Sequence, residues 1–143
     1  MKKLLAGILV VFTASSALAG PDSDLLAKIG HLGTWAVDCT RAASKENPYV
    51  IFVPSKAGYP TRILKMDSSI DRTSEIRDLR LLEDNKVKYW MMGSSELDNR
   101  EITIVFLGNR LRAVEAIDAK GTKYVTDGKT SQSETPWFQK CQG

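Results

Sequence analysis

The chain has 143 residues, with 20 Lys and Arg, 17 Asp and Glu, one histidine and two cysteines. This length suits a single domain, and so balanced a charge excludes the basic surface that nucleic-acid binding requires. One histidine and two cysteines are also too few for a typical zinc site or Cys–His pair. We therefore predict no cofactor, no metal and no nucleic-acid partner.

The first 19 residues have the order of a secretory signal peptide. "MKK" is basic, "LLAGILVVF" is apolar, and "ALAG" offers small residues at a cleavage site. The apolar run is shorter than the roughly 20 residues that span a bilayer. We predict cleavage after Ala19, a periplasmic or secreted protein, and no membrane anchor after cleavage; an uncleaved anchor is the alternative. Residues 20–143 then form the single mature domain, with 18 basic residues against 17 acidic ones once Lys2 and Lys3 are removed.

One short helix is predicted directly after the signal, in "PDSDLLAKIGHLG". Asp22 or Ser23 can cap its start, and Gly30 or Gly33 can end it. Its apolar face is formed by Leu25, Leu26 and Ile29.

From Gly33 onward the sequence consists of short strand-like runs separated by turn residues. Turns are marked by "PSKAGY", "EDNK", "GN", "DAKG" and "DGK". Residues 74–83 ("SEIRDLRLLE") can be mistaken for a helix. Such spacing without helical crossovers predicts an all-β antiparallel meander, closed as a barrel or folded as a sandwich. The nine expected strands are 34–39, 48–54, 59–67, 74–83, 87–93, 100–107, 110–117, 122–126 and 135–141.

A tryptophan precedes each cysteine by four residues, in "WAVDC" (Trp35 to Cys39) and "WFQKC" (Trp137 to Cys141). An exported chain with two cysteines is expected to form one disulfide. Residues four apart in a strand share a face, so Trp35, Val37 and Cys39 are expected on one side. If the sheet closes, the first and last strands become neighbours and Cys39 can meet Cys141 across the seam. The alternative is two core tryptophans beside a bond between loops.

Gly33-Thr34-Trp35, directly after a short helix and at the start of the first strand, resembles the opening motif of lipocalins and the wider calycin group. The resemblance implies an 8–9-stranded calycin-like barrel with one N-terminal helix and one disulfide. It also implies that Trp35 plugs one end under a late basic residue, with Arg112 and Lys140 as candidates. The short domain is most similar to compact bacterial barrels, which include small periplasmic inhibitors of host lysozyme or proteases.

The run "YWMM" is the first candidate for a binding surface. Alternation sends Tyr89 and Met91 to one face of a strand and Trp90 and Met92 to the other, and both faces are apolar. One pair belongs to the core. The other either forms an exposed contact surface for a ligand, a partner or a second copy, or is covered by a loop or by the N-terminal helix. Residues 100–107 ("REITIVFL") share this two-sided apolar character.

Charged residues within apolar strands are the second set of candidates. Glu115 or Asp78 can point inward and meet Arg62 or Arg112. A charge pair buried in a barrel is a candidate ligand anchor, because small-molecule pockets place few polar groups among apolar walls. Solvent exposure of these side chains is the alternative. The single histidine, His31, is expected at the end of the helix, where a histidine favours the negative end of the helix dipole.

The sequence leaves three functions open and favours a non-catalytic one. The first is a barrel that binds a small apolar ligand, and the second is a protein-binding barrel such as a periplasmic enzyme inhibitor or envelope accessory protein. The third, an enzyme, lacks any nucleophile elbow, phosphate loop or nucleotide fingerprint. An interior cavity above about 300 Å³ would favour the first, and a packed interior the second.

Overall fold

A computed structural model describes residues 20–55, 58–67, 71–83 and 85–142. The predicted signal peptide, residues 1–19, lies outside the described residues. The helices and strands in chain order are α1 Pro21–Lys28, β1 Gly33–Ala36, β2 Tyr49–Val53, β3 Thr61–Lys65, β4 Asp71–Leu82, β5 Lys86–Gly93, the 3-10 helix η1 Glu96–Asp98, β6 Arg100–Leu107, β7 Arg110–Asp118, β8 Lys123–Val125 and β9 Phe138–Lys140.

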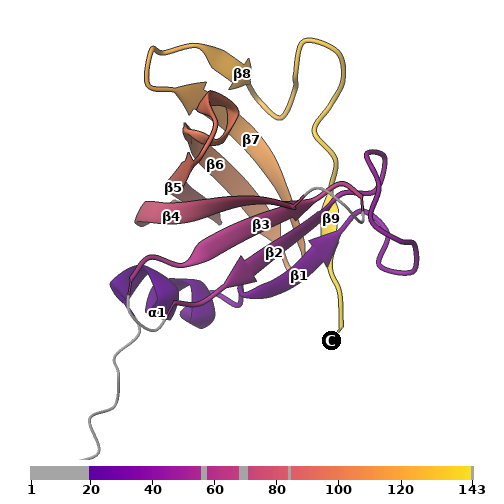
Figure 1. Ribbon diagram of the computed structural model, residues 1–143, viewed down its shortest axis with the longest axis horizontal. Coiled ribbons are helices and arrows are strands. Elements are labelled where there is room, and N and C mark those ends of the chain that lie inside the picture. The colour runs from indigo at the N-terminus through magenta and orange to yellow at the C-terminus, as the bar shows by residue number, and fades with distance from the viewer. Residues whose placement is uncertain (1–19, 56–57, 68–70, 84, 143) are drawn as a thin grey trace, which may run out of the picture.

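The strands form one antiparallel sheet, and eight of them close it into a barrel (Figure 1). Strands β1 to β7 each pair with the next strand in the chain, as expected of a meander. Strand β9 pairs with β7 on one side and with β1 on the other, and so completes the ring. Strand β8 pairs with β7 as an additional ninth strand. The predicted all-β meander barrel with one short N-terminal helix is therefore confirmed.

The seam between the first and last strands is held by backbone bonds and by the disulfide. The amide of Cys141 donates to the carbonyl of Thr34 (2.8 Å), and the amide of Lys140 donates to that of Asn109 (2.9 Å). Cys39 and Cys141 are bonded, with their Cα atoms 5.5 Å apart. The predicted disulfide across the barrel seam is confirmed.

Strand β4 contains a bulge that explains its helix-like sequence. Asp78 adopts a positive φ of 54°, and the pairing with β5 shifts register between Arg77 and Arg80. The extra residue brings Ile76 and Leu79, three positions apart, to the same buried side of the strand. A spacing of three is what a helix would show, although here it arises from a bulged strand.

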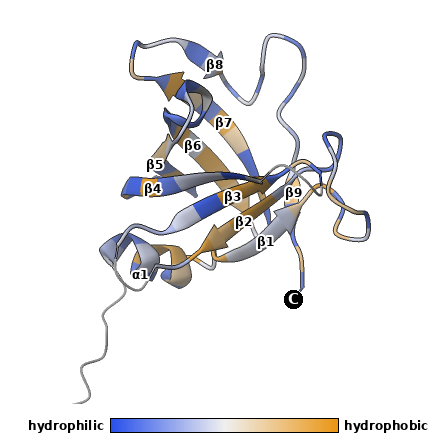
Figure 2. Ribbon diagram, in the orientation of Figure 1, coloured by the Kyte–Doolittle hydropathy of each residue, from blue (hydrophilic) through white to orange (hydrophobic). Residues whose placement is uncertain are grey.

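The core fills the inside of the barrel and follows the alternation of the strands. Strand β2 is among the most hydrophobic, whereas β4 is largely hydrophilic (Figure 2). Cross-strand partners share a face, so a residue that pairs with an inward-facing residue of the neighbouring strand also faces inward. The buried apolar side chains of the strands include Val50, Phe52, Ile76, Leu79, Val87, Tyr89, Met91, Ile102, Ile104 and Leu111.

Helix α1 lies at one end of the barrel, where the chain enters β1 (Figure 1). Leu26 is fully buried in the core. The predicted N-terminal cap at Asp22 or Ser23 is wrong, because the N-cap residue is Gly20, with no side-chain capping bond, and Pro21 occupies the first turn. The predicted end at Gly30 is confirmed, because Gly30 follows the C-cap Ile29 with a positive φ of 70°. The hydroxyl of Ser23 instead accepts a bond from the amide of Ser55 (3.1 Å) and ties the helix to the chain that follows β2.

Trp35 is buried at this end of the barrel, with 3% of its surface exposed. Its indole N–H donates to the carbonyl of His31 (2.8 Å). The basic residue over its ring is Lys140, whose Nζ lies 5.6 Å from the ring centroid and donates to the carbonyl of Gly30 (2.7 Å). Of the two basic candidates, Lys140 therefore holds this position, because β9 pairs Lys140 directly with Trp35. Arg112 does not.

The expectation that Val37 shares the inward face of Trp35 is wrong. Strand β1 ends at Ala36, and beyond it the strict alternation of faces no longer holds. Both Trp35 and Ala36 are buried, whereas Val37 is 37% exposed. The disulfide is consequently made from chain that has already left the regular strand.

The disulfide should supply a large part of the domain's stability. It closes a loop with a sequence separation of 102 residues, for which the chain-entropy model gives about 4–5 kcal/mol. The Cys39→Ser/Cys141→Ser double variant should lose about that much free energy of unfolding in urea melts. A loss under about 1 kcal/mol would contradict this estimate. Thiol titration of the unfolded, unreduced protein should find no free thiol.

Trp35→Ala should destabilise the domain by about 3–5 kcal/mol, because it removes a buried aromatic side chain and leaves a cavity. Trp90→Ala is the matched control, since it removes the same side chain from the outside of the barrel and should cost under about 1 kcal/mol. Denaturant melts of the two variants measure the difference. Equal costs would mean that Trp35 does not close the barrel end.

Candidate functional site

The "YWMM" run divides between the core and the surface as its alternation predicts. Tyr89 is fully buried and Met91 is 5% exposed, whereas Met92 is 41% exposed and Trp90 is half-buried. Trp90 and Met92 line an external groove of about 360 Å³ together with Arg77 and Asp78 of β4. The surface of this strand is therefore not covered by α1.

Strand β4 supplies the polar half of this surface. Arg77 lies directly across from Trp90 in the sheet and stacks on the ring of Tyr59, 4.4 Å from its centroid. The guanidinium of Arg77 also donates to Glu75 (2.6 Å). We name the outer-surface residues Tyr59, Arg77, Trp90 and Met92 the β4–β5 patch. Aromatic residues, arginine and methionine are the side chains enriched at protein–protein contacts.

Arg62 points into the barrel. Its cross-strand partners are Phe52 on β2 and Ser74 on β4, and both are buried. Arg62 and Tyr89 line an interior cavity of about 60 Å³ together with seven apolar side chains. Burial lowers the pKa of Arg62, and burial raises the pKa of Tyr89 to about 12, so the phenol remains protonated at neutral pH.

Two buried hydroxyls in this region have no hydrogen-bond partner. They are the Tyr89 hydroxyl and the Ser74 hydroxyl, on residues 0% and 2% exposed. An unpaired buried polar group costs roughly 1–3 kcal/mol and so calls for an explanation. The sequence analysis did not single out Ser74, although it shares the face of Ile76 in "SEI".

Further charged side chains face the same end of the barrel interior. Arg72 pairs across the sheet with the inward Leu64, and Arg100 pairs with the buried Met91. Arg72 Nε lies 3.8 Å from Asp98 Oδ1, and the hydroxyl of Ser95 donates to Asp98 (2.6 Å). The sequence analysis missed these residues because inward direction depends on strand register.

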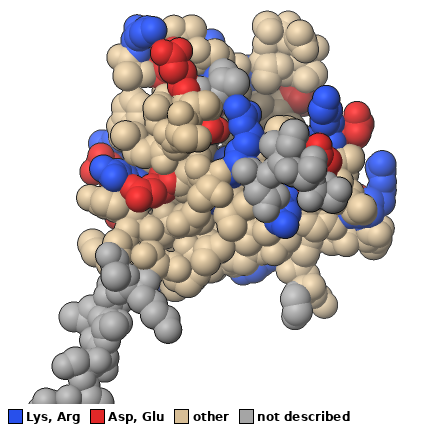
Figure 3. Space-filling model, viewed as in Figure 1, with Lys and Arg blue, Asp and Glu red and all other residues tan. Residues whose placement is uncertain are grey.

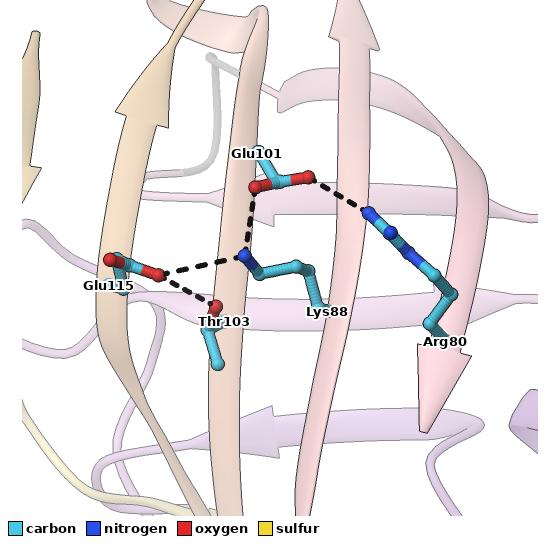
Figure 4. Close-up of polar contacts among 5 residues, drawn as sticks. All are labelled: Arg80, Lys88, Glu101, Thr103 and Glu115. Atoms are coloured by element: carbon cyan, nitrogen blue, oxygen red, sulfur yellow. Dashed lines mark hydrogen bonds and ion pairs between the residues drawn. The ribbon is translucent and has the colours of Figure 1, made fainter. Parts of the chain in front are cut away.

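Glu115 faces outward and belongs to a surface ion network (Figure 4). Lys88 Nζ lies 3.0 Å from Glu101 and 3.8 Å from Glu115, and Arg80 bonds the other oxygen of Glu101 (3.1 Å). Thr103 donates to Glu115 (3.3 Å). Of the two alternatives for Glu115, the outward one holds, because Glu115 pairs with the outward Thr103 beside a bulge between β6 and β7.

Asp78 and Arg112 also lie outside the barrel interior. Asp78 is exposed at the β4 bulge. Arg112 contacts Glu134 (3.7 Å), donates to the carbonyl of Gly128 (3.1 Å) and lies 5.3 Å from the ring of Trp137. These contacts anchor the segment after β8 to the barrel. Arg112 is thus placed to hold this segment rather than to bind a ligand inside.

The visible surface carries no extended area of one charge. On the face shown in Figure 3, basic and acidic side chains are interspersed. Within the described ranges, no three His, Cys, Asp or Glu side chains come together as metal ligands. No helix in the described part of the chain is long and apolar enough to cross a membrane.

His31 is a core residue at the α1 end of the barrel. It is 2% exposed and its ring lies 4.3 Å from that of Phe52 and 5.7 Å from that of Trp35. Its Nε2 atom has no hydrogen-bond partner. Burial, with a smaller contribution from Lys140, lowers the pKa of His31 to about 4, so the ring is neutral at neutral pH.

The buried His31 should make the domain less stable in mild acid. Its pKa is about 4 when folded, against an ordinary value of 6.5, so its contribution is complete above pH 6.5 and is lost as the pH falls toward 4. The loss should approach about 3 kcal/mol at pH 4. Urea melts from pH 7 to pH 4 should show this slope in the wild type and a flatter one in His31→Phe. Identical slopes would contradict it.

Comparisons with known proteins add no relative. No protein-family model matches the chain, and neither a curated protein nor a solved structure matches it. The candidate sites therefore rest on this chain's own pairing, burial and contacts.

Proposed function

We propose that this protein is a non-catalytic binding barrel that acts by contact with another protein. The observation that carries the proposal is the packed interior. Its cavity of about 60 Å³ is well below the roughly 300–1,000 Å³ of pockets that hold drug-sized ligands. A barrel of eight strands is just wide enough either to fill with side chains or to enclose one ligand, and the described side chains of this one leave a cavity too small for a drug-sized ligand.

The β4–β5 patch is the contact surface that we propose. The exposed Met92, the half-buried Trp90 and Arg77 line one groove of about 360 Å³ together with Asp78, and Arg77 stacks on the ring of Tyr59. These side chains supply apolar area and one charged donor that can pair with a carboxylate or carbonyl of a partner. A second copy of this chain is the alternative partner for the same surface.

The calycin resemblance supports a role of the inhibitor or envelope-accessory kind. Beyond the Gly33-Thr34-Trp35 motif, it is supported by the position of Lys140 over the Trp35 ring and by the helix before β1. The signal-like sequence of the first 19 residues supports a location in the periplasm or outside the cell. A calycin-like barrel that binds a small apolar ligand inside is the second candidate, and the size of the cavity weighs against it.

The ligand alternative can be tested directly on protein purified under native conditions from cells that export it. Organic extraction followed by mass spectrometry should recover no apolar compound near one equivalent per chain. A stoichiometric apolar compound would contradict the protein-binding proposal and would favour the second candidate.

The contact surface can be tested with a photo-crosslinking amino acid introduced at Trp90. A matched control carries the same group at Leu107, which is 55% exposed and lies outside the β4–β5 patch. Irradiation of exporting cells should give a discrete adduct at Trp90 that excess wild-type protein competes away, and none at Leu107. Analytical ultracentrifugation of the purified protein shows whether the partner is a second copy of this chain, because a dimer then sediments faster than a monomer. The same adducts from both positions would contradict the proposed surface.

A further inference from the structure

The interior cavity brings a guanidinium and a phenol together within apolar walls. Arg62 and Tyr89 are its two polar lining residues. Both side chains point into the barrel, because Arg62 pairs across the sheet with the buried Phe52 and Tyr89 pairs with the buried Ile102. That hydroxyl has no hydrogen-bond partner although Tyr89 is fully buried. Both groups can donate hydrogen bonds toward the same space.

The charge around this cavity is unbalanced toward the positive side. No carboxylate is among its lining residues. The described carboxylate that couples to Arg62 is Asp98, and Asp98 already accepts a bond from Ser95 and lies 3.8 Å from Arg72. Arg62 is half-buried, and a charge withdrawn from water is costly unless it is paired, so Arg62 favours an anion in the cavity.

The size and lining of the cavity restrict the chemistry of its occupant. A volume of about 60 Å³ holds a few water molecules or an anion of about three or four non-hydrogen atoms. A guanidinium cannot accept hydrogen bonds, and the apolar walls offer no polar partner. A carboxylate can accept from both Arg62 and Tyr89 while a short alkyl group contacts the apolar walls.

We propose that the barrel interior is a carboxylate-binding site, in which Arg62 and Tyr89 donate to the two oxygens of one carboxylate. The carboxylate belongs either to a free small acid of the size of formate or acetate, or to the end of a peptide chain that enters the barrel. Arg72, which lies 3.8 Å from Asp98, and Arg100, which stacks on the ring of Tyr124, also pair with inward-facing residues and add positive charge that attracts either source. The site does not depend on the β4–β5 patch, so the two proposals can fail separately.

The test is a titration of the purified mature protein with sodium acetate, followed by backbone amide NMR at constant ionic strength in a bulky sulfonate buffer. The wild type should show saturable shifts at Arg62, Tyr89 and their neighbours. Tyr89→Phe should bind acetate at least tenfold more weakly, because it loses a hydrogen bond to a charged acceptor. Its own fold should survive, because the variant removes an unpaired buried hydroxyl without changing the ring.

Ser74→Ala is the matched control, because it also removes one buried unpaired hydroxyl but from a residue that does not line the cavity. Its affinity for acetate should stay within about twofold of the wild type. Arg80→Gln removes a surface guanidinium and controls for general ionic effects. Equal affinity for acetate in Tyr89→Phe and the wild type would overturn the proposal, and acetate shifts that do not saturate would exclude a free small acid as the source of the carboxylate.

A second arm separates the two sources of the carboxylate. A tripeptide with a free C-terminal carboxylate is compared with the same peptide carrying a C-terminal amide. Binding of acetate alone assigns the site to a small acid, and binding of the free peptide but not the amide assigns it to a chain terminus. If neither acetate nor the free peptide binds, the proposal is wrong.

Discussion

Insertion of β9 between β1 and β7 is the constraint on which the rest of the structure depends. Without this short strand, β1 and β7 would present open edges and the interior would lose one wall. With it, the last strand pairs directly with the first, which sets Lys140 opposite Trp35 and brings Cys141 to Cys39. The same seam therefore determines the closed ring, the covalent bond and the closed end of the barrel.

Closure also determines which side chains remain available for function. Strands β4 to β6 carry apolar or charged residues on both faces, and closure of the barrel buries the side chains that face inward. What is left outside is the β4–β5 patch and the network around Lys88, Glu101 and Glu115. Inside, the packing of the described residues leaves a small cavity in which Arg62 stands among apolar neighbours. The proposed binding role of the surface and the proposed carboxylate site within the core both depend on this one division.

Much of the fold could be predicted from alternation, turn residues and the two cysteines. In the "YWMM" run, strict alternation correctly separates Tyr89 and Met91 from Trp90 and Met92. Prediction failed where regular pairing ends. Val37 lies just beyond the end of β1. In β4, the bulge at Asp78 adds one residue, so the residues after it face the opposite side from the one that simple alternation predicts.

The candidate site was less predictable because it depends on register between distant strands. The choice of Lys140 over Arg112 as the residue above Trp35 follows from pairing across the seam, which no local pattern contains. The inward direction of Arg62 and the outward direction of Glu115 likewise depend on which strands are neighbours and on the bulge before Glu115. Ser74 and Asp98 became visible only once those strands were assembled.

Closure by β9 is tested most directly by hydrogen exchange at the seam. The amides of Lys140 and Cys141 donate to Asn109 and Thr34 across the two sides of β9. Both amides should exchange as slowly as those in the centre of β5 and β6, because they open only when the barrel opens. Rapid exchange at both positions, with β5 and β6 still protected, would contradict a barrel that depends on its last strand.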